Sequence, residues 1–228
     1  MQICGYQKTT LLDFPGCVAA TVFTGSCNFS CPFCHNRSLV INPANRIEEE
    51  EIFQFLEKRR PVLSGICISG GEPTLQEDLI PFLLRVRSLG YRIKLDTNGY
   101  LPQVLKDLID RKLLDYIAMD IKSGHCTYPT ITGRPDFVME PILASVKLIE
   151  NSGIGYEFRT TVVKEFHTAD DFLEIADMLS SSSPYYLQSF RDSGGVLMPG
   201  LHAYSPEEMR RFLDLILPKL PKASIRGL

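Results

Sequence analysis

Short apolar runs rich in β-branched residues alternate along the chain with longer stretches of helical periodicity. Apolar runs of this length, bounded by turn formers, are typical of strands buried on both faces. Six strands are predicted, at Val18–Phe23, Val62–Ile68, Tyr91–Leu95, Tyr116–Ile121, Tyr156–Val163 and Tyr185–Phe190. A helical pattern follows each strand, in two cases after a longer irregular segment.

Helix starts carry recognisable capping residues. The spacing of a capping box occurs at Asn45 and Glu48, at Thr74 and Glu77, and at Thr168 and Asp171. Ser205, Pro206 and Glu208 supply N-cap, N1 and N3 residues for the last helix. Helices are predicted at Glu48–Lys58, Glu77–Ser88, from Leu101, at Pro141–Asn151, after Thr168, and from Ser205 to Leu217. Turn formers dominate Lys122–Met139, which is predicted to be an irregular loop.

Strands that are separated by helices and buried on both faces imply a parallel sheet with right-handed crossovers. We therefore predict an α/β fold, an open partial (β/α)6 barrel, with a flat doubly wound sheet as the alternative. The units fill the 228 residues, so we expect a single domain over 1–228 with a short N-terminal extension, 1–16.

Composition narrows the class of partner. The net charge of -3 and pI near 5.8 argue against a basic field that would bind nucleic acid. No apolar run approaches a membrane span and no secretory signal is seen, so we expect a cytoplasmic protein with no membrane partner. Seven cysteines in that compartment are expected to be reduced, and any cluster of them is a candidate metal site.

Three cysteines are clustered after the first strand, in TGSCNFSCPFCHN, at Cys27, Cys31 and Cys34. Three thiolates can ligate one face of a 4Fe-4S cluster and leave the fourth iron open to a substrate or cofactor. The alternatives are a zinc site with His35 as a fourth ligand, and inert buried thiols.

The sequence assigns no catalytic or ligand role to the other four cysteines or to two of the histidines. Cys17 and Cys67 are expected to be core or strand-edge residues, because they lie at or within apolar strands. No role is assigned to Cys4, Cys126, His167 and His202.

Further polar motifs follow the later strands. Gly70 and Gly71 permit close backbone approach to a ligand and Glu72 can accept from an ammonium group, although an ordinary turn would look the same. Arg159, inside a strand, needs an anion, either a cofactor carboxylate or an internal salt bridge. DTNG and MDIK end the third and fourth strands. Active sites of parallel α/β folds lie at this edge.

The cysteine spacing, with Phe33 before the last cysteine, resembles the signature of the radical S-adenosylmethionine (SAM) superfamily. DTNG and MDIK resemble the glycyl-radical-enzyme activating enzymes, and residues 5–36 resemble the longer form of anaerobic ribonucleoside-triphosphate reductase activating proteins. Cys17 stands where a lysine is common in them.

The resemblance implies a chemistry. A 4Fe-4S cluster would reductively cleave SAM to a 5'-deoxyadenosyl radical, which would make a glycyl radical on a partner enzyme, most simply the anaerobic reductase. A flavodoxin- or ferredoxin-like protein would supply the electron. The alternatives are activation of pyruvate formate-lyase or another glycyl radical enzyme, a small-molecule radical reaction, and a non-catalytic iron-sulfur or zinc module.

The resemblance also implies residue roles. Cofactor contacts would come from Phe33, Gly70, Gly71, Glu72, Thr97, Asn98, Lys122 and Arg159. Asp96, Thr97 and Asp120 would be candidate ligands of a monovalent cation, and a strand-end ion pair is the alternative for Asp120 and Lys122. Gln188, Ser189 and Phe190 match more loosely, toward the adenosine.

Overall fold

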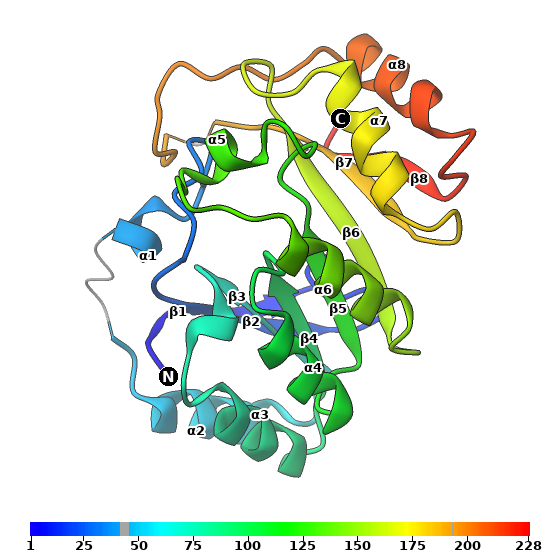
Figure 1. Cartoon of the computed structure of the whole chain (residues 1–228). Coiled ribbons are helices and arrows are strands. Elements are labelled where there is room, and N and C mark those ends of the chain that lie inside the picture. The colour runs from blue at the N-terminus through cyan, green and yellow to red at the C-terminus, as the bar shows by residue number, and fades with distance from the viewer. Residues whose placement is uncertain (42–45, 193) are drawn as a thin grey trace. The chain divides into compact units, whose positions relative to one another are not determined.

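The computed structural model describes residues 1–41, 46–192 and 194–228. The chain divides into two compact units (Figure 1). Unit 1 comprises Met1–Asn28, Ser38–Thr97 and Gln103–Ala118, and unit 2 comprises Phe29–Arg37, Asn98–Pro102 and Met119–Leu228. One boundary therefore falls inside the cysteine loop, which leaves Cys27 in unit 1 and the other two loop cysteines in unit 2. The single domain expected over 1–228 stays a prediction.

Within the described residues, eight strands follow one another in the sheet in chain order. They are β1 (Ile3–Thr10), β2 (Ala19–Thr24), β3 (Gly65–Gly70), β4 (Arg92–Thr97), β5 (Tyr116–Asp120), β6 (Gly155–Val162), β7 (Tyr185–Ser189) and β8 (Ala223–Arg226). β1 is antiparallel to β2, whereas β2/β3, β3/β4, β6/β7 and β7/β8 are parallel pairs. The predicted parallel α/β class is confirmed, and the six predicted strands correspond to β2 through β7.

The helices lie between the strands as predicted. They are α1 (Arg37–Ile41), α2 (Glu49–Arg59), the 3-10 helix η1 (Pro73–Leu75), α3 (Leu79–Ser88), α4 (Pro102–Asp110), α5 (Tyr128–Thr132), α6 (Glu140–Glu150), α7 (Ala169–Met178) and α8 (Pro206–Ile216). The short helix α5 lies inside the segment predicted to be wholly irregular, so that prediction is wrong for these five residues.

Two of the predicted helix starts are confirmed in detail. Thr168 and Asp171 form a capping box at α7, and Ser205 and Glu208 form one at α8. The capping box predicted at Thr74 and Glu77 is wrong, because α3 begins after Asp78 and not at Glu77. Asn45 of the remaining pair lies outside the described residues.

Two strands were not predicted, and each has a weak sequence signal. Gln7, Lys8 and Thr9 of β1 are exposed, so this antiparallel strand lacks the continuous apolar character used to find the others. β8 has four residues, of which Ala223 alone is buried. β1 occupies part of the N-terminal extension predicted at 1–16.

Each unit has an aromatic and aliphatic core of its own. In unit 1, α2 and α3 lie side by side (Figure 1), with the ring centroids of Phe53 and Phe82 5.0 Å apart. In unit 2, α7 packs on α8 through Phe172 and Phe212, whose centroids are 4.7 Å apart. Burying such rings is the main favourable contribution to each unit's stability. Among the described residues, no helix is long and apolar enough to cross a membrane.

Candidate functional site

In unit 1, the start of the cysteine loop is fixed by main-chain contacts with the end of β3. The amide of Gly71 donates to the carbonyl of Thr24 and that of Glu72 to the carbonyl of Ser26, each at 2.8 Å. A Cβ atom at Gly71 would lie 1.9 Å from the Ser26 carbonyl oxygen, so this position requires glycine. Ser26 itself has a positive φ of 65°. Half-buried Cys27 follows directly, so its backbone position depends on these contacts.

Glu72 is a buried carboxylate with three identified donors. Its side chain is 1% exposed, and Oε1 accepts from the Thr74 amide at 3.1 Å, the Thr74 hydroxyl at 2.6 Å and the Thr97 hydroxyl at 2.8 Å. These bonds cap η1, which explains why Thr74 does not cap α3. Two residues predicted to contact the cofactor, Glu72 and Thr97, are therefore joined directly.

A buried lysine lies beside Asp96, one of the predicted cation ligands. Lys94 is 2% exposed, forms an ion pair with Asp96, and its Nζ lies 3.8 Å from the Cys67 sulfur. The other Asp96 oxygen accepts from the Ser69 hydroxyl at 2.9 Å. Sequence reasoning missed Lys94, although a lysine two residues before Asp96 in an apolar strand shares its face and was a usable signal.

In unit 2, the other two loop cysteines form a tight turn. The amide of Cys34 donates to the carbonyl of Cys31 at 3.0 Å. Burial raises the pKa of the Cys31 thiol to about 11, while the positive charge of Lys122 opposes that shift. Phe33, which precedes Cys34 in the sequence, is buried and packs against Phe166 and His167, with both centroid distances 5.9 Å.

Asp120 and Lys122, at the end of β5, are brought together with Arg159, which lies inside β6. Asp120 accepts from Arg159 Nε at 2.8 Å through one oxygen and from Lys122 Nζ at 3.1 Å through the other. Burial opposes ionisation of Asp120, but the charges of Arg159 and Lys122 outweigh it and lower its pKa from 3.8 to about 2. Both salt bridges weighed as alternatives from the sequence are therefore present, and the cofactor roles of these residues stay predictions.

The charge cluster continues through residues that sequence reasoning missed. Glu157 is 1% exposed, and its two carboxylate oxygens accept hydrogen bonds from Nη1 and Nη2 of Arg226, at 2.8 and 2.7 Å. Arg159 Nη1 lies 4.0 Å from Glu157, so the Arg159 guanidinium lies between two carboxylates. Arg226 belongs to β8, which was not predicted, and its guanidinium lies 3.4 Å from the centre of the Tyr186 ring.

His167, which received no role from the sequence, holds the main chain at Lys122. It is fully buried, its Nδ1 accepts from the Val163 amide at 3.1 Å, and its Nε2 lies 2.8 Å from the Lys122 carbonyl oxygen. Because Nδ1 is the acceptor, the proton is assigned to Nε2, which donates to that carbonyl. Burial lowers the pKa of His167 and favours this neutral form.

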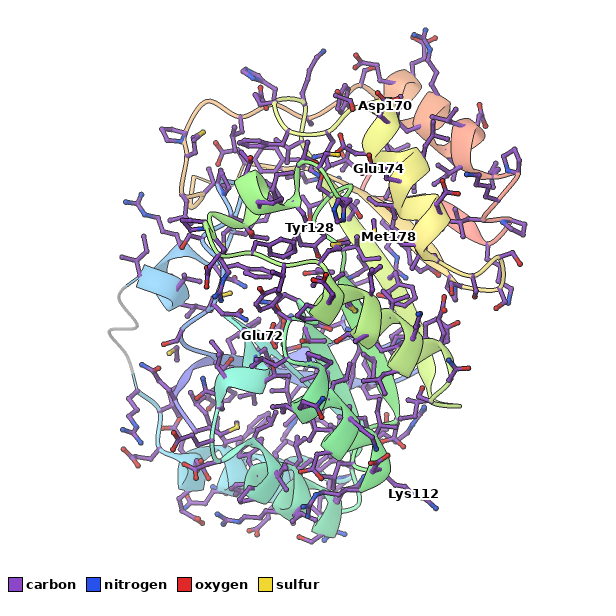
Figure 2. The ribbon with its side chains drawn as sticks, in the orientation of Figure 1. Glu72, Lys112, Tyr128, Asp170, Glu174 and Met178 are labelled. Atoms are coloured by element: carbon purple, nitrogen blue, oxygen red, sulfur yellow. The ribbon has the colours of Figure 1, made fainter. Side chains whose placement is uncertain are left out.

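The next residues are held against α7. Asp171 accepts from the hydroxyls of Ser123, at 3.0 Å, and Thr127. A Cβ at Gly124 would lie 2.9 Å from the Asp171 Cα and 2.6 Å from a carboxylate oxygen of Glu174, a side chain labelled in Figure 2. The segment after β5 is therefore fixed closely to this helix.

The other residues named from the sequence differ in burial and make local contacts. Asn98 is buried and its Oδ1 accepts from the Tyr100 amide at 3.0 Å. The ring of His35 stacks on Phe190, with centroids 5.5 Å apart. Cys17 and Cys67 are buried as predicted, whereas Cys126 is exposed.

The cysteine loop has the donors that an iron-sulfur cluster requires. Among the described residues, no three His, Cys, Asp or Glu side chains converge on a point that a single metal ion could occupy. A 4Fe-4S cluster is ligated through separate irons, so its cysteines need not converge on one point. The three loop cysteines are not in disulfides, and Cys31 has a lysine ammonium nearby that would offset thiolate charge. These residues fit a cluster.

Comparisons with known proteins support this assignment. The family model described as the radical SAM superfamily matches residues 21–179. A candidate glycyl-radical enzyme activating enzyme of Methanocaldococcus jannaschii is 32% identical over 192 residues, covering 82% of this chain and 79% of that protein. A pyruvate formate-lyase-activating enzyme of Clostridium pasteurianum is 29% identical, covering 71% of this chain and 68% of that protein.

Solved structures share the fold at low sequence identity. Streptococcus suis SuiB, in a crystal structure with its precursor peptide SuiA, has a TM-score of 0.72 and 14% identity, covering 91% of this chain. This chain spans about half of SuiB, 48% of its length. The structure of anSMEcpe with bound AdoMet has a TM-score of 0.58 and 16% identity, covering 89% of this chain and 62% of that chain. The family match over most of the residues and the confirmed order of parallel strands lead to one conclusion: this chain belongs to the radical SAM superfamily and is an enzyme that uses a 4Fe-4S cluster and S-adenosylmethionine.

Proposed function

We propose that the protein is an activating enzyme that installs a glycyl radical on anaerobic ribonucleoside-triphosphate reductase. The observation that carries the activase class is the three-cysteine loop in a chain 32% identical to a candidate activating enzyme over most of its length. The choice of the reductase is supported by residues 5–36, whose sequence resembles the longer form of that reductase's activating proteins.

In this proposal Cys27, Cys31 and Cys34 ligate three irons of the cluster and leave the fourth open. The bound cluster and SAM together supply a 5'-deoxyadenosyl radical that can abstract a hydrogen atom from a glycine Cα. The chain's own tasks are to bind the cofactor, to keep water away, and to admit a loop of the partner protein. Phe33 serves the second task, because it directly precedes Cys34 in the sequence and is only 4% exposed.

Cofactor binding is assigned to groups of matching charge. Glu72 accepts from the methionyl ammonium, in the orientation that its bonds to Thr74 and Thr97 impose. Lys122 and Arg159 attract the methionyl carboxylate, while Asp120 holds both cations in place before the cofactor arrives.

Main-chain and amide groups complete the proposed set. Gly70 and Gly71, which have no side chain, offer their main chain to the ligand, and Asn98 contacts the ribose. Asp96, Thr97 and Asp120 remain the proposed monovalent cation ligands. A flavodoxin- or ferredoxin-like protein is the proposed electron donor.

The test is anaerobic reconstitution with iron and sulfide, followed by incubation with SAM, dithionite and the reductase. A glycyl radical detected by electron paramagnetic resonance (EPR), with release of methionine and 5'-deoxyadenosine, is the expected result. Cys27→Ala, Cys31→Ala or Cys34→Ala should each abolish SAM cleavage, whereas exposed Cys126→Ala is the matched control and should retain it. Cleavage that persists in a loop variant refutes the ligand assignment.

A second candidate substrate is pyruvate formate-lyase, favoured by the 29% identity to the activating enzyme of Clostridium pasteurianum. The two are separated by presenting each enzyme to the same reconstituted protein. A glycyl radical on the lyase, with none on the reductase, would replace the reductase as the proposed substrate and leave the activase class intact.

A further inference from the structure

We infer that the Tyr128 hydroxyl is a hydrogen-bond donor reserved for the sulfur of Cys31 when that sulfur ligates the cluster. This inference rests on the proposed ligation by the loop cysteines. It makes Tyr128 a positioning and tuning residue of the iron site, a role that the sequence motifs did not suggest.

The proton of the buried Tyr128 hydroxyl has no acceptor in the part of the chain that the structure describes. The side chain is fully buried and is labelled in Figure 2, and among the described residues no group accepts a hydrogen bond from the hydroxyl. Leaving a buried donor unsatisfied costs free energy, and native proteins rarely tolerate it without a reason. A ligand present in the working enzyme is one such reason.

Packing keeps the ring from turning its hydroxyl to solvent. Tyr128 stacks on Phe137 with centroids 4.8 Å apart and planes inclined by 15°. The ring centroid of Phe137 lies 6.3 Å from that of Phe29, which stands two residues before Cys31 in the sequence. The aromatic contacts therefore connect the Tyr128 ring to the cysteine loop, within unit 2.

The main chain makes the same connection at the other end of α5. The amide of Ser30, directly before Cys31, donates to the carbonyl of Thr132 at 2.8 Å. A Cβ atom at Gly133, the C-cap of α5, would lie 3.3 Å from the Ser30 Cβ, so the two segments are in close contact. Tyr128 opens this short helix and is thereby held on the loop that carries Cys31.

Among the groups that act on the hydroxyl, the Cys31 sulfur is the acceptor that we assign to it. The charged groups that act on Tyr128 are Lys122, Cys31 and Asp120. The Lys122 ammonium and main-chain amide are donors, so neither takes the hydroxyl proton. The Asp120 oxygens accept from Arg159 and Lys122, and neither oxygen bonds to the hydroxyl. Sulfur in a cluster ligand accepts hydrogen bonds, and such bonds tune the reduction potential.

The effect on the cluster has a defined sign. Reduction adds negative charge to the cluster and its sulfur ligands, so a hydrogen bond to a ligating sulfur stabilises the reduced state more than the oxidised state. Removing the Tyr128 hydroxyl should therefore make the midpoint potential more negative.

The experiment compares Tyr128→Phe with Tyr185→Phe. Tyr185 is also fully buried in unit 2, but its hydroxyl has a partner, the Thr160 hydroxyl, at 2.7 Å. In iron-free protein, Tyr128→Phe should unfold in urea at the same or a higher concentration than wild type, whereas Tyr185→Phe should unfold at a lower one. In reconstituted protein without SAM, an EPR-monitored redox titration should give a more negative potential for Tyr128→Phe alone.

Three results would overturn the inference. If the midpoint potential of the Tyr128→Phe cluster equals that of wild type, the proposed hydrogen bond to Cys31 is refuted. An unchanged potential with weaker SAM binding assigns the hydroxyl to the cofactor instead. Loss of stability in iron-free Tyr128→Phe, as large as that of Tyr185→Phe, shows that the hydroxyl has a partner in the protein.

Iron and sulfide content separates this inference from the function on which it rests. Wild-type protein that binds no cluster refutes both. Wild-type protein that binds a cluster through Cys31, lost in Cys31→Ala, with no potential shift in Tyr128→Phe, refutes the inference alone.

Discussion

Replacing Asp120 with Asn removes the anion that lies between two cations. The carboxylate accepts from Arg159 Nε at 2.8 Å and from Lys122 Nζ at 3.1 Å, and together they lower its pKa from 3.8 to about 2 against the effect of burial. Each unit of pKa difference between the folded and unfolded states is worth about 1.4 kcal/mol, so the ion pairs contribute about 2 kcal/mol at neutral pH. The side chain is 32% exposed, and solvent screening makes this an upper value.

The pH dependence follows from the direction of the shift. A carboxylate whose pKa is lowered on folding stabilises the protein fully above its unfolded pKa, and that contribution is lost as the pH falls through the folded pKa. Asp120→Asn should therefore lower the free energy of unfolding by at most about 2 kcal/mol at pH 7, with the deficit reduced to roughly half by pH 3.

Urea unfolding of iron-free, reduced protein at several pH values measures this difference. Asp136→Asn is the control, because Asp136 pairs with Arg134 on the exposed surface of the same unit and its loss should not be measurable. A deficit in Asp120→Asn that is constant from pH 7 to pH 3 would contradict the reasoning, because it would come from something other than the carboxylate charge.

Two further predictions follow from the site. Lys122→Ala should weaken SAM binding, measured by equilibrium titration of the reconstituted protein, and should leave the iron content unchanged. Equal SAM affinity in the variant and in wild type would refute the proposed contact between Lys122 and the SAM carboxylate. Gly71→Ala places a methyl group 1.9 Å from a backbone oxygen and should destabilise the protein by about 1–3 kcal/mol in urea unfolding. Gly5→Ala, where the nearest atom is 3.9 Å away, is the control, and equal effects of the two would contradict the clash.

The sequence indicated the parallel strands well because burial on both faces leaves a continuous apolar run. It failed at β1, whose exposed Gln7 and Lys8 give no such run, and at β8, which is too short. The helix cap at Thr74 was misplaced because Pro73 begins a 3-10 turn that uses Glu72 as its cap. Local spacing cannot distinguish that turn from the start of α3.

The candidate site was predictable where residues lie on motifs and unpredictable where they act through tertiary contacts. The sequence identified Asp120, Lys122 and Arg159 and allowed an ion pair between the first two, but the bond from Arg159 to the same carboxylate becomes evident only in the structure. His167 and Asp171 hold the segment after β5 from residues more than 40 positions later in the chain. No spacing rule links residues so far apart, and sequence periodicity reports one element at a time.

The main-chain hydrogen bonds that hold the loop before Cys27 determine which sequence changes the cysteine site can accept. The bonds from Gly71 and Glu72 run from amide to carbonyl, so they depend on the parallel register that pairs Thr24 with Gly70 and on no side-chain identity at Ser26. A chimera that replaces the residues after Cys27 with those of another superfamily member should keep its first cysteine in position. An insertion of one residue in β2 or β3 would instead displace that cysteine while every predicted ligand is still present in the sequence.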